Sequence, residues 1–343
     1  EISLGYLQQD IEQDGQPEIH LDSLKDYQQT RLGVGVAGAD REMLASDIDI
    51  TSLTVSYDLG WSSITSSSSW IDYQSTSNSD VSRSTASFGF FTGLTTAGPY
   101  SNYGIKNVDR FSQELRLGSQ LEGKIQFVAG IFYEDQEMDR SQTWTWSGVP
   151  ALNPNPGLNL FNVPGVESLE QQAVFGELSY EITNEFTATL GARYFDYDRK
   201  SADGFTFNSN TTALDETLTV ADTGTNYKAN LSYDLNDDML LYAQWAEGFR
   251  LGRGLNNPSP DPFCDADGNG LIDELGVPRP TQLESDSSES IELGLKTSFA
   301  DQRIILNAAI YRIHWDEIPV SVRASPACVV NMNAGKAVSE GVE

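Results

Sequence analysis

The clearest chemical pattern in the 343-residue chain is a run of oxygen-bearing residues in its last third. Residues 265–273 read D-A-D-G-N-G-L-I-D. Oxygen ligands at alternating positions, with a glycine at the sixth position that permits a sharp turn, are typical of a calcium-binding loop. The sequence therefore predicts a structural calcium site. Its candidate ligands are Asp265, Asp267, Asn269, Leu271 through its carbonyl, and Asp273.

The end of this loop differs from a helix-flanked calcium loop. Its twelfth position is Gly276, where such loops carry a glutamate that binds through both oxygens. Glu274 comes two residues too early to replace it, and no flanking helices are expected. An acidic turn that holds no ion is the alternative interpretation.

Enzyme chemistry has little support in the sequence. His20 and His314 are the only histidines, and no nucleophile motif, phosphate loop or zinc-ligand spacing occurs. The 50 acidic residues against 21 Lys and Arg give a net charge of -29. Nucleic acid is therefore not an expected partner, because phosphate contacts need basic clusters. We predict that the protein is not an enzyme.

Aromatic side chains offer a second kind of candidate site. Trp144, Trp146 and Phe161 fall in a Pro-rich connection predicted over residues 139–170. Exposed aromatics on such a loop could hold a siderophore, a haem-like ring or a glycan. The alternative is that they pack against neighbouring loops.

The elements that position these residues are long β-strands. Residues 288–315 alternate apolar and polar side chains along two arms joined by a short polar turn at 300–303. This period of two predicts a hairpin whose arms have about ten residues or more, which is the length of a membrane-crossing β-strand. No apolar run approaches the roughly 18 residues of a membrane helix.

The hairpin pattern recurs along the whole chain and predicts an all-β, antiparallel transmembrane barrel with about 12 strands. A secreted sandwich or a β-helix is the alternative, although their strands or repeats are shorter. Aromatic residues near the turns suggest a membrane-interface girdle: Tyr57, Trp61, Tyr180, Phe186, Tyr233 and Phe299. Short turns are expected near residues 59, 122, 184, 236 and 301, and long connections over 13–47, 74–109, 139–170, 200–222 and 250–286.

The two cysteines are predicted to form a disulfide. Cys264 and Cys328 are the only cysteines, an even pair that an oxidising compartment would join. Between them the chain descends one strand and climbs its neighbour, so both fall in loops at the same end of the barrel. Loops above adjacent strands can bring two Cα atoms within the roughly 4.4–6.8 Å that a disulfide needs.

Several stretches resemble the TonB-dependent outer-membrane receptors. LLYAQWAEGFRLGRGLN at 240–256 is similar to one of their rising strands, and the hairpin at 289–320 is similar to their following strand pair. NAGKAVSEGVE at 333–343 looks like the start of their next strand. FSQELRLGS at 111–119 and GARY at 191–194 fit the same family.

This resemblance implies a Gram-negative outer-membrane receptor that imports a scarce nutrient, most often a ferric siderophore. Its implied partners are the TonB energy-coupling complex, outer-membrane lipid and the small nutrient ligand. Residues 1–343 would form part of a barrel of about 22 strands, with no plug domain among them. A passive porin and a secreted carbohydrate-binding or adhesive β-protein are the alternative functions.

Overall fold

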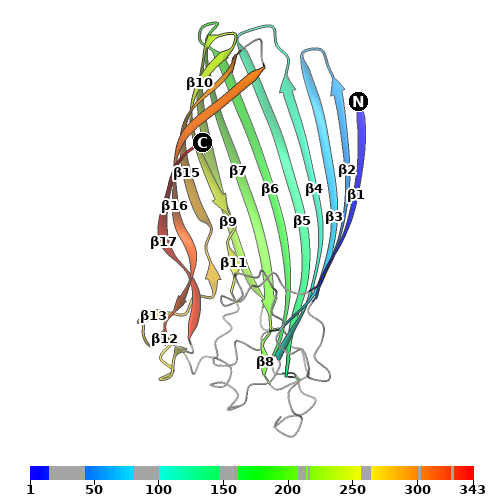
Figure 1. The fold of residues 1–343 in the computed structure, drawn as a ribbon, viewed down its shortest axis with the longest axis vertical. Helices are drawn as coiled ribbons and strands as arrows, with labels where there is room; N and C mark the ends of the chain where they lie inside the picture. Colours follow the sequence, from blue (N-terminus) through cyan, green and yellow to red (C-terminus); the bar gives the residue numbers. More distant parts are fainter. Residues whose placement is uncertain are drawn as a thin grey trace.

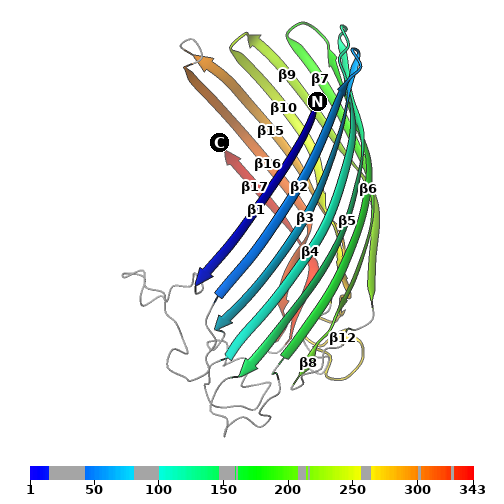
Figure 2. The same ribbon diagram turned by 90° about the vertical axis from the view of Figure 1, so that its right-hand side faces the viewer.

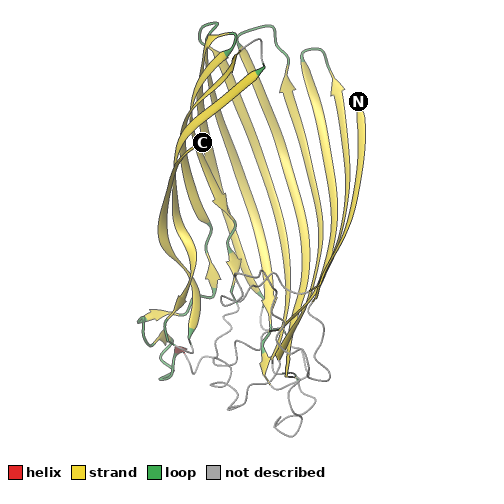
Figure 3. Ribbon diagram, viewed as in Figure 1, coloured by secondary structure: helices red, strands yellow, loops and turns green. Residues whose placement is uncertain are grey.

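The structure is a computed structural model that describes residues 1–14, 43–80, 100–146, 159, 161–207, 214, 217–255, 264–299, 303–325 and 328–343. Its regular elements are β-strands (Figures 1 and 3). Twelve long strands form one antiparallel sheet in which each pairs with its neighbour along the chain. They are β1 (Ile2–Asp14), β2 (Met43–Asp58), β3 (Ser62–Asp80), β4 (Tyr100–Ser119), β5 (Ile125–Trp146), β6 (Phe161–Glu181), β7 (Phe186–Asp203), β9 (Leu218–Asn236), β10 (Met239–Arg250), β15 (Asp286–Phe299), β16 (Ile304–Arg323) and β17 (Val329–Val342).

Five two-residue strands lie in the connections. They are β8 (Thr206–Phe207), β11 (Arg253–Gly254), β12 (Leu271–Ile272), β13 (Val277–Pro278) and β14 (Gln282–Leu283). β8 pairs with β6, β11 with β14, and β12 with β13. No helix in the described part of the chain is long and apolar enough to cross a membrane.

The sheet curves into an incomplete barrel (Figure 2). β1 and β17 are the two ends of the strand order and are not paired with each other in the described residues. The described short turns lie together at the upper end of Figure 1, while the strand ends that lead into the long connections lie at the opposite end. The predicted all-β, antiparallel fold and its strand count are confirmed, and among the described residues the short turns share one end of the sheet.

Side chains alternate between the two faces of the sheet as the sequence predicted. Leu115, Ile131, Val174 and Tyr194 lie side by side on four adjacent strands, and each is 43–56% exposed. This apolar row belongs to the outer face. Arg193, the residue before Tyr194, lies on the inner face, where its guanidinium stands 5.1 Å from the centre of the Phe132 ring.

The strands are longer than expected and the connections correspondingly shorter. β5 has 22 residues, about twice what a membrane-crossing strand needs. The predicted connection over 139–170 therefore begins after Trp146 and ends before Phe161. Strand pairing continues here because polar side chains tolerate a sheet that extends beyond the membrane into water.

Two levels of aromatic residues mark the outer face. The predicted girdle near the short turns is present, with Tyr57, Trp61, Tyr180, Tyr233 and Phe299 each at least 45% exposed. The sequence did not reveal a second level, where Trp70, Phe111 and Tyr133 lie on adjacent strands with ring centres 5.4 and 6.5 Å apart.

The spacing of these levels fits a membrane. Tyr180 pairs with Ile125, and Tyr133 lies eight residues further along β5. Eight residues span about 26 Å of strand. With the usual tilt of about 40°, this gives about 20 Å of height, close to the roughly 25 Å apolar band of outer-membrane barrels.

Candidate functional site

The described residues of the connection between β10 and β15 lie across the inner face, at the end of the sheet opposite the short turns. We call these residues, 251–255 and 264–285, the mouth loop. Its base is closed by the β11–β14 pair, in which Arg253 faces Leu283. The ring of Phe249, just before it, stacks on Phe195 of β7 with centres 3.6 Å apart. Since β9 lies between β7 and β10 in the sheet, this contact shows that the end of β10 turns inward.

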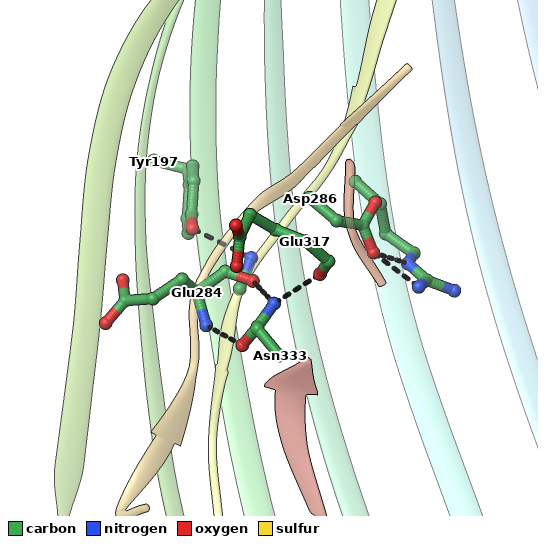
Figure 4. A network of polar contacts seen from close by, with 7 residues as sticks. Tyr197, Glu284, Asp286, Glu317 and Asn333 are labelled. Atoms are coloured by element: carbon green, nitrogen blue, oxygen red, sulfur yellow. Dashed lines mark hydrogen bonds and ion pairs between the residues drawn. The ribbon is translucent and has the colours of Figure 1, made fainter. Parts of the chain in front are cut away.

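Tyr197 and Arg199 of β7 hold the start of the mouth loop. The Tyr197 hydroxyl accepts a hydrogen bond from the backbone N–H of Gly252 at 2.9 Å and shares another with Ser285 at 2.8 Å. Arg199 donates to the Gly252 carbonyl at 3.1 Å. Tyr197 is 1% exposed, so one buried hydroxyl joins the two ends of the loop. Figure 4 shows Tyr197 with one of these bonds as a dashed line. A side chain at Gly252 would not fit, because its Cβ would lie 2.6 Å from the Leu283 carbonyl oxygen.

Asn333 of β17 joins the end of the mouth loop to β16. Its amide donates to the carbonyls of Glu284 at 3.2 Å and Glu317 at 2.7 Å, and its oxygen accepts from the Glu284 N–H at 2.9 Å. Figure 4 shows Asn333 between these two residues. Glu317 interrupts the register of β16 and is the one non-glycine residue with positive φ, 57°, among the described residues. The bond from Asn333 helps to hold this unfavourable conformation.

The predicted disulfide is present in the structure. Cys264 and Cys328 are joined, with their Cα atoms 5.1 Å apart. Both are buried in a small apolar cluster with Ile272 and Val330. The disulfide therefore ties the mouth loop to the connection between β16 and β17.

The candidate calcium ligands converge next to this disulfide. The carboxylates of Asp265, Asp267 and Asp273 offer oxygens within 4.8 Å of one another. Asn269 lies beside them, because its amide donates to Asp267 at 2.8 Å. Leu271, whose carbonyl is the fifth predicted ligand, begins β12.

Backbone geometry explains the convergence. Gly268 and Gly270 have positive φ values of 68° and 85°, so the chain can turn back around the carboxylates. Asp265 accepts from the N–H groups of Asn269 and Gly270, at 2.9 and 2.8 Å. Calcium binding itself stays a prediction.

The candidate aromatic residues lie on strands rather than in a loop, which corrects the predicted location. Trp144 belongs to β5 and faces Phe161 at the start of β6, with ring centres 6.0 Å apart in an edge-on arrangement. Phe161 is 9% exposed and also contacts Phe205 at 5.4 Å. The side chain of Trp146 lies outside the described residues. These contacts favour packing for Trp144 and Phe161, and their role in ligand binding stays a prediction.

A pocket of about 670 Å³ lies between the inner face of the sheet and the base of the mouth loop. Arg199, Arg250 and Arg253 contribute to its wall. Arg250 donates through Nε to Asp286 at 2.9 Å and stands 5.1 Å from the centre of the Trp315 ring. Sequence reasoning missed this pocket, although GFRLGRG at 248–254 places two of its arginines between glycines.

The comparisons with known proteins decide the family. A family model described as TonB dependent receptor-like, beta-barrel, matches residues 7–343, which is nearly the whole chain. The chain belongs to the TonB-dependent receptor family. Members of this family are barrels of the Gram-negative outer membrane and act as receptors and transporters rather than enzymes. No curated protein matches this TonB-dependent receptor by sequence.

Solved receptors share its fold at low identity. The ferric yersiniabactin uptake receptor FyuA from Yersinia pestis is 16% identical with a TM-score of 0.67, over 90% of this chain and 41% of that one. The siderophore receptor PiuA from Acinetobacter baumannii is 18% identical with a TM-score of 0.66, over 99% and 50%. The ferric-catecholate import receptor Fiu from E. coli K12, in its closed form, is 16% identical with a TM-score of 0.62, over 99% and 52%. The chain thus spans about half the length of these receptors.

Proposed function

We propose that the protein is an outer-membrane receptor that imports a scarce nutrient, with a ferric siderophore as the expected ligand and TonB as the energy-coupling partner. The match to the family over residues 7–343 carries this proposal. The names of FyuA, PiuA and Fiu, which describe receptors for siderophores or ferric compounds, support the ligand class.

The geometry supports a ligand that arrives from the long-loop end. The apolar outer face and its two aromatic levels fit a membrane, which leaves the short turns on the periplasmic side and the mouth loop outside. The pocket beneath the mouth loop then lies where a ligand would enter the lumen. Trp144 and Phe161 lie at the same end of β5 and β6.

Uptake of radioactive iron tests the proposal. Iron-starved cells that carry the gene are expected to accumulate iron from a siderophore faster than cells that lack it, and deletion of TonB should abolish the difference. Uptake that persists without TonB would contradict the coupling. Uptake that is unchanged when the gene is deleted, across siderophores of several chemical classes, would contradict the ligand class.

The alternative functions make different predictions in the same cells. A passive porin would admit small solutes in proportion to their concentration and without TonB. A secreted carbohydrate-binding or adhesive protein would be soluble without detergent. The exposed apolar outer face disfavours the secreted protein, since Leu190, Leu293 and Ile310 are each more than 50% exposed.

We also propose that the twelve strands form part of a barrel of about 22. Unpaired strand edges are not stable in lipid, and both β1 and β17 present such an edge in the described residues. A barrel closed by further pairing would satisfy the exposed backbone groups of both strands.

The loop at 265–273 is proposed to bind calcium with a structural role. Three converging carboxylates supply hard oxygen ligands, which calcium prefers, and Asn269 lies beside them. An ion would neutralise the mutual repulsion of the carboxylates.

A further inference from the structure

The apolar part of the outer face carries a group of polar side chains on β3 and β4. Ser66 lies opposite Val55 of β2 and Leu115 of β4, and Ser68 lies opposite Gln113 of β4. Directly opposed residues share a face of the sheet, and Leu115 belongs to the outer face. The side chains of Ser66, Ser68 and Gln113 therefore point toward lipid, and we call these three residues the polar patch.

The neighbouring strands are apolar at the corresponding outward positions. The polar patch lies on the short-turn side of Trp70 in β3 and of Phe111 in β4, which belong to the second aromatic level. The outward residues of β5, β6 and β7 on the short-turn side of that level are Phe127, Ala129, Ile131, Leu178, Gly176, Val174, Ala188, Leu190 and Ala192. Hydrocarbon offers no hydrogen bonds, so lipid alone does not explain a glutamine and two serines at this level.

Hydrogen bonds within the polar patch satisfy part of its polar groups. The Gln113 amide donates to the Ser66 hydroxyl at 3.0 Å and to the Glu114 carbonyl at 3.1 Å, and its oxygen accepts from Ser68. Among the described residues, the Ser66 hydroxyl donates no hydrogen bond and the Ser68 hydroxyl accepts none. A hydroxyl can do both, so the polar patch keeps a donor and an acceptor for a partner.

These properties fit a second copy of the chain. A surface with both a donor and an acceptor is complementary to itself. The axis of a two-fold dimer in a membrane runs along the membrane normal, so residues at the same height meet each other. The two serines are small and let the walls approach closely, which matters in lipid because apolar contacts there gain little over contact with acyl chains.

The acidic residues on the same strands are compatible with a second copy. Asp72 and Asp109 are opposed to each other, four residues beyond Ser68 and Gln113 on their strands. Strands tilted by about 40° in each copy cross at about 80° where two walls face each other, so the acidic residues diverge from the dimer axis. Salt water beyond the membrane also screens their repulsion over about 8 Å.

We propose that the polar patch is the contact between two copies of this protein in the outer membrane. Gln113 of each copy lies near the two-fold axis, and Ser66 and Ser68 exchange hydrogen bonds with the other copy. The inference depends on the outer face lying in lipid. It does not depend on the proposed ligand or on TonB.

Cross-linking of introduced cysteines in vesicles tests the contact. Leu115→Cys lies beside the polar patch and leaves its three residues intact, whereas Leu190→Cys is the control on the outer face of β7. The native cysteines are joined to each other and do not react. Each full-length variant is purified, placed at low density in vesicles of phosphatidylethanolamine and phosphatidylglycerol, and treated with a short membrane-permeant bismaleimide. Leu115→Cys should give about fivefold more covalent dimer than Leu190→Cys, or a larger excess.

Two substitutions in the Leu115→Cys protein separate the contact from barrel stability. Gln113→Leu should lower the yield of dimer to that of the Leu190→Cys control. It should not lower the temperature of unfolding in a heat-modifiability gel, because leucine is favourable in lipid. Gln172→Leu replaces an outward glutamine of β6, opposite Tyr133, and should leave the dimer unchanged.

The outcomes decide between a second copy and other partners. Equal yields from the two cysteine variants, or a dimer that persists in Gln113→Leu, would overturn the proposed contact. The dimer should strengthen as salt rises, because salt screens the acidic residues of the two copies, and a dimer that weakens would contradict an uncharged contact. Cross-links to other proteins in native outer membranes, with none between copies in vesicles, would overturn a second copy as the partner.

Discussion

Asn333 shows how much a single side chain contributes at the mouth of the barrel. One amide group satisfies three backbone groups, two on Glu284 and one on Glu317. Tyr197 has a similar role at the other end of the mouth loop, through Gly252 and Ser285. These two side chains, far apart in the sequence, hold the two ends of the mouth loop, which form part of the wall of the pocket beneath it.

Replacement of Asn333 by alanine is expected to loosen the end of the mouth loop. The loss of its hydrogen bonds should lower the local opening free energy by about 1–3 kcal/mol. Amide hydrogen exchange at Glu284 should then accelerate by about tenfold or more. Asn331→Ala is the matched control, because Asn331 lies on β17 like Asn333 but forms one exposed hydrogen bond with Ser321 of β16. It should have little effect on amide exchange at Glu284. Equal exchange in both variants would contradict the role of Asn333.

The two faces of β9 give a second test with neighbouring residues. Leu231 is 45% exposed on the outer face, whereas Asn230, beside it, faces the lumen. Leu231→Arg should cost about 2–4 kcal/mol near the membrane midplane and reduce barrel assembly, and Leu293→Arg should do the same. Asn230→Arg should be tolerated. A heat-modifiability gel that shows equal loss at Leu231 and Asn230 would contradict the membrane orientation.

At the scale of elements, the strands continue beyond the second aromatic level, away from the short turns. In this part of the sheet the outer face becomes acidic. Asp49, Asp72, Asp109 and Glu137 lie directly opposite one another on β2, β3, β4 and β5. Like charges in directly opposed positions destabilise a sheet by a few tenths of a kcal/mol to about 1 kcal/mol per pair. Strand pairing in this region therefore persists against electrostatic repulsion.

Asp109→Asn is expected to stabilise the barrel, because it relieves repulsion from Asp72 and Glu137 at once. The melting temperature should rise in low salt, and the gain should shrink as salt screens the charges. Lys200→Gln is a control in which an attractive charge pair is removed instead of a repulsive one. It removes a cation that lies 3.4 Å from Asp198 and should not stabilise the protein. A melting temperature that is unchanged at Asp109→Asn in low salt would contradict this account.

The mouth loop combines a disulfide and the proposed calcium site within one short segment. Cys264 directly precedes Asp265, so the disulfide fixes the position of the first ligand. Reduction should therefore weaken calcium affinity, and removal of calcium should speed proteolysis within residues 264–285. Asp267→Asn should weaken binding further, whereas Glu274→Gln, which lies outside the carboxylate cluster, should have little effect. Calorimetry that detects no calcium binding to the oxidised protein would contradict the proposal.

The whole molecule has two chemically different ends. Turns of a few residues join the strands at one end, and the mouth loop with its disulfide lies at the other (Figure 1). Outer-membrane barrels carry their long loops on the outside of the cell, so we expect the mouth loop to face outward here. Part of the net charge of -29 lies toward this end, on the row of acidic residues of the outer face.

Labelling of introduced cysteines in intact cells tests this orientation. Glu274→Cys, in the mouth loop, should react with a membrane-impermeant maleimide, whereas Asp237→Cys, in the turn between β9 and β10, should react only after the outer membrane is opened. Both sites are exposed, so access alone decides the result. Labelling of Asp237→Cys in intact cells would reverse the proposed orientation.

The sequence by itself determined the features that depend on local pattern. Alternation along residues 288–315 requires strands, since a period of two places apolar groups on one face. The strand order then placed Cys264 and Cys328 at one end, and the spacing of acids and glycines at 265–273 was sufficient to predict converging carboxylates. Strand ends were missed because nothing in a polar segment marks where pairing stops.

Tertiary structure alone decided what lies inside the barrel. Arg250 and Arg253 lie in the segment 240–256, for which the sequence indicated a resemblance to a family strand but no pocket. Arg199 lies more than 50 residues earlier in the chain. Their meeting depends on the inward turn at the end of β10, which places Phe249 on Phe195 and Gly252 on Tyr197. Such contacts between strands that are not neighbours leave no periodic trace in the sequence, because they depend on the curvature of the whole sheet.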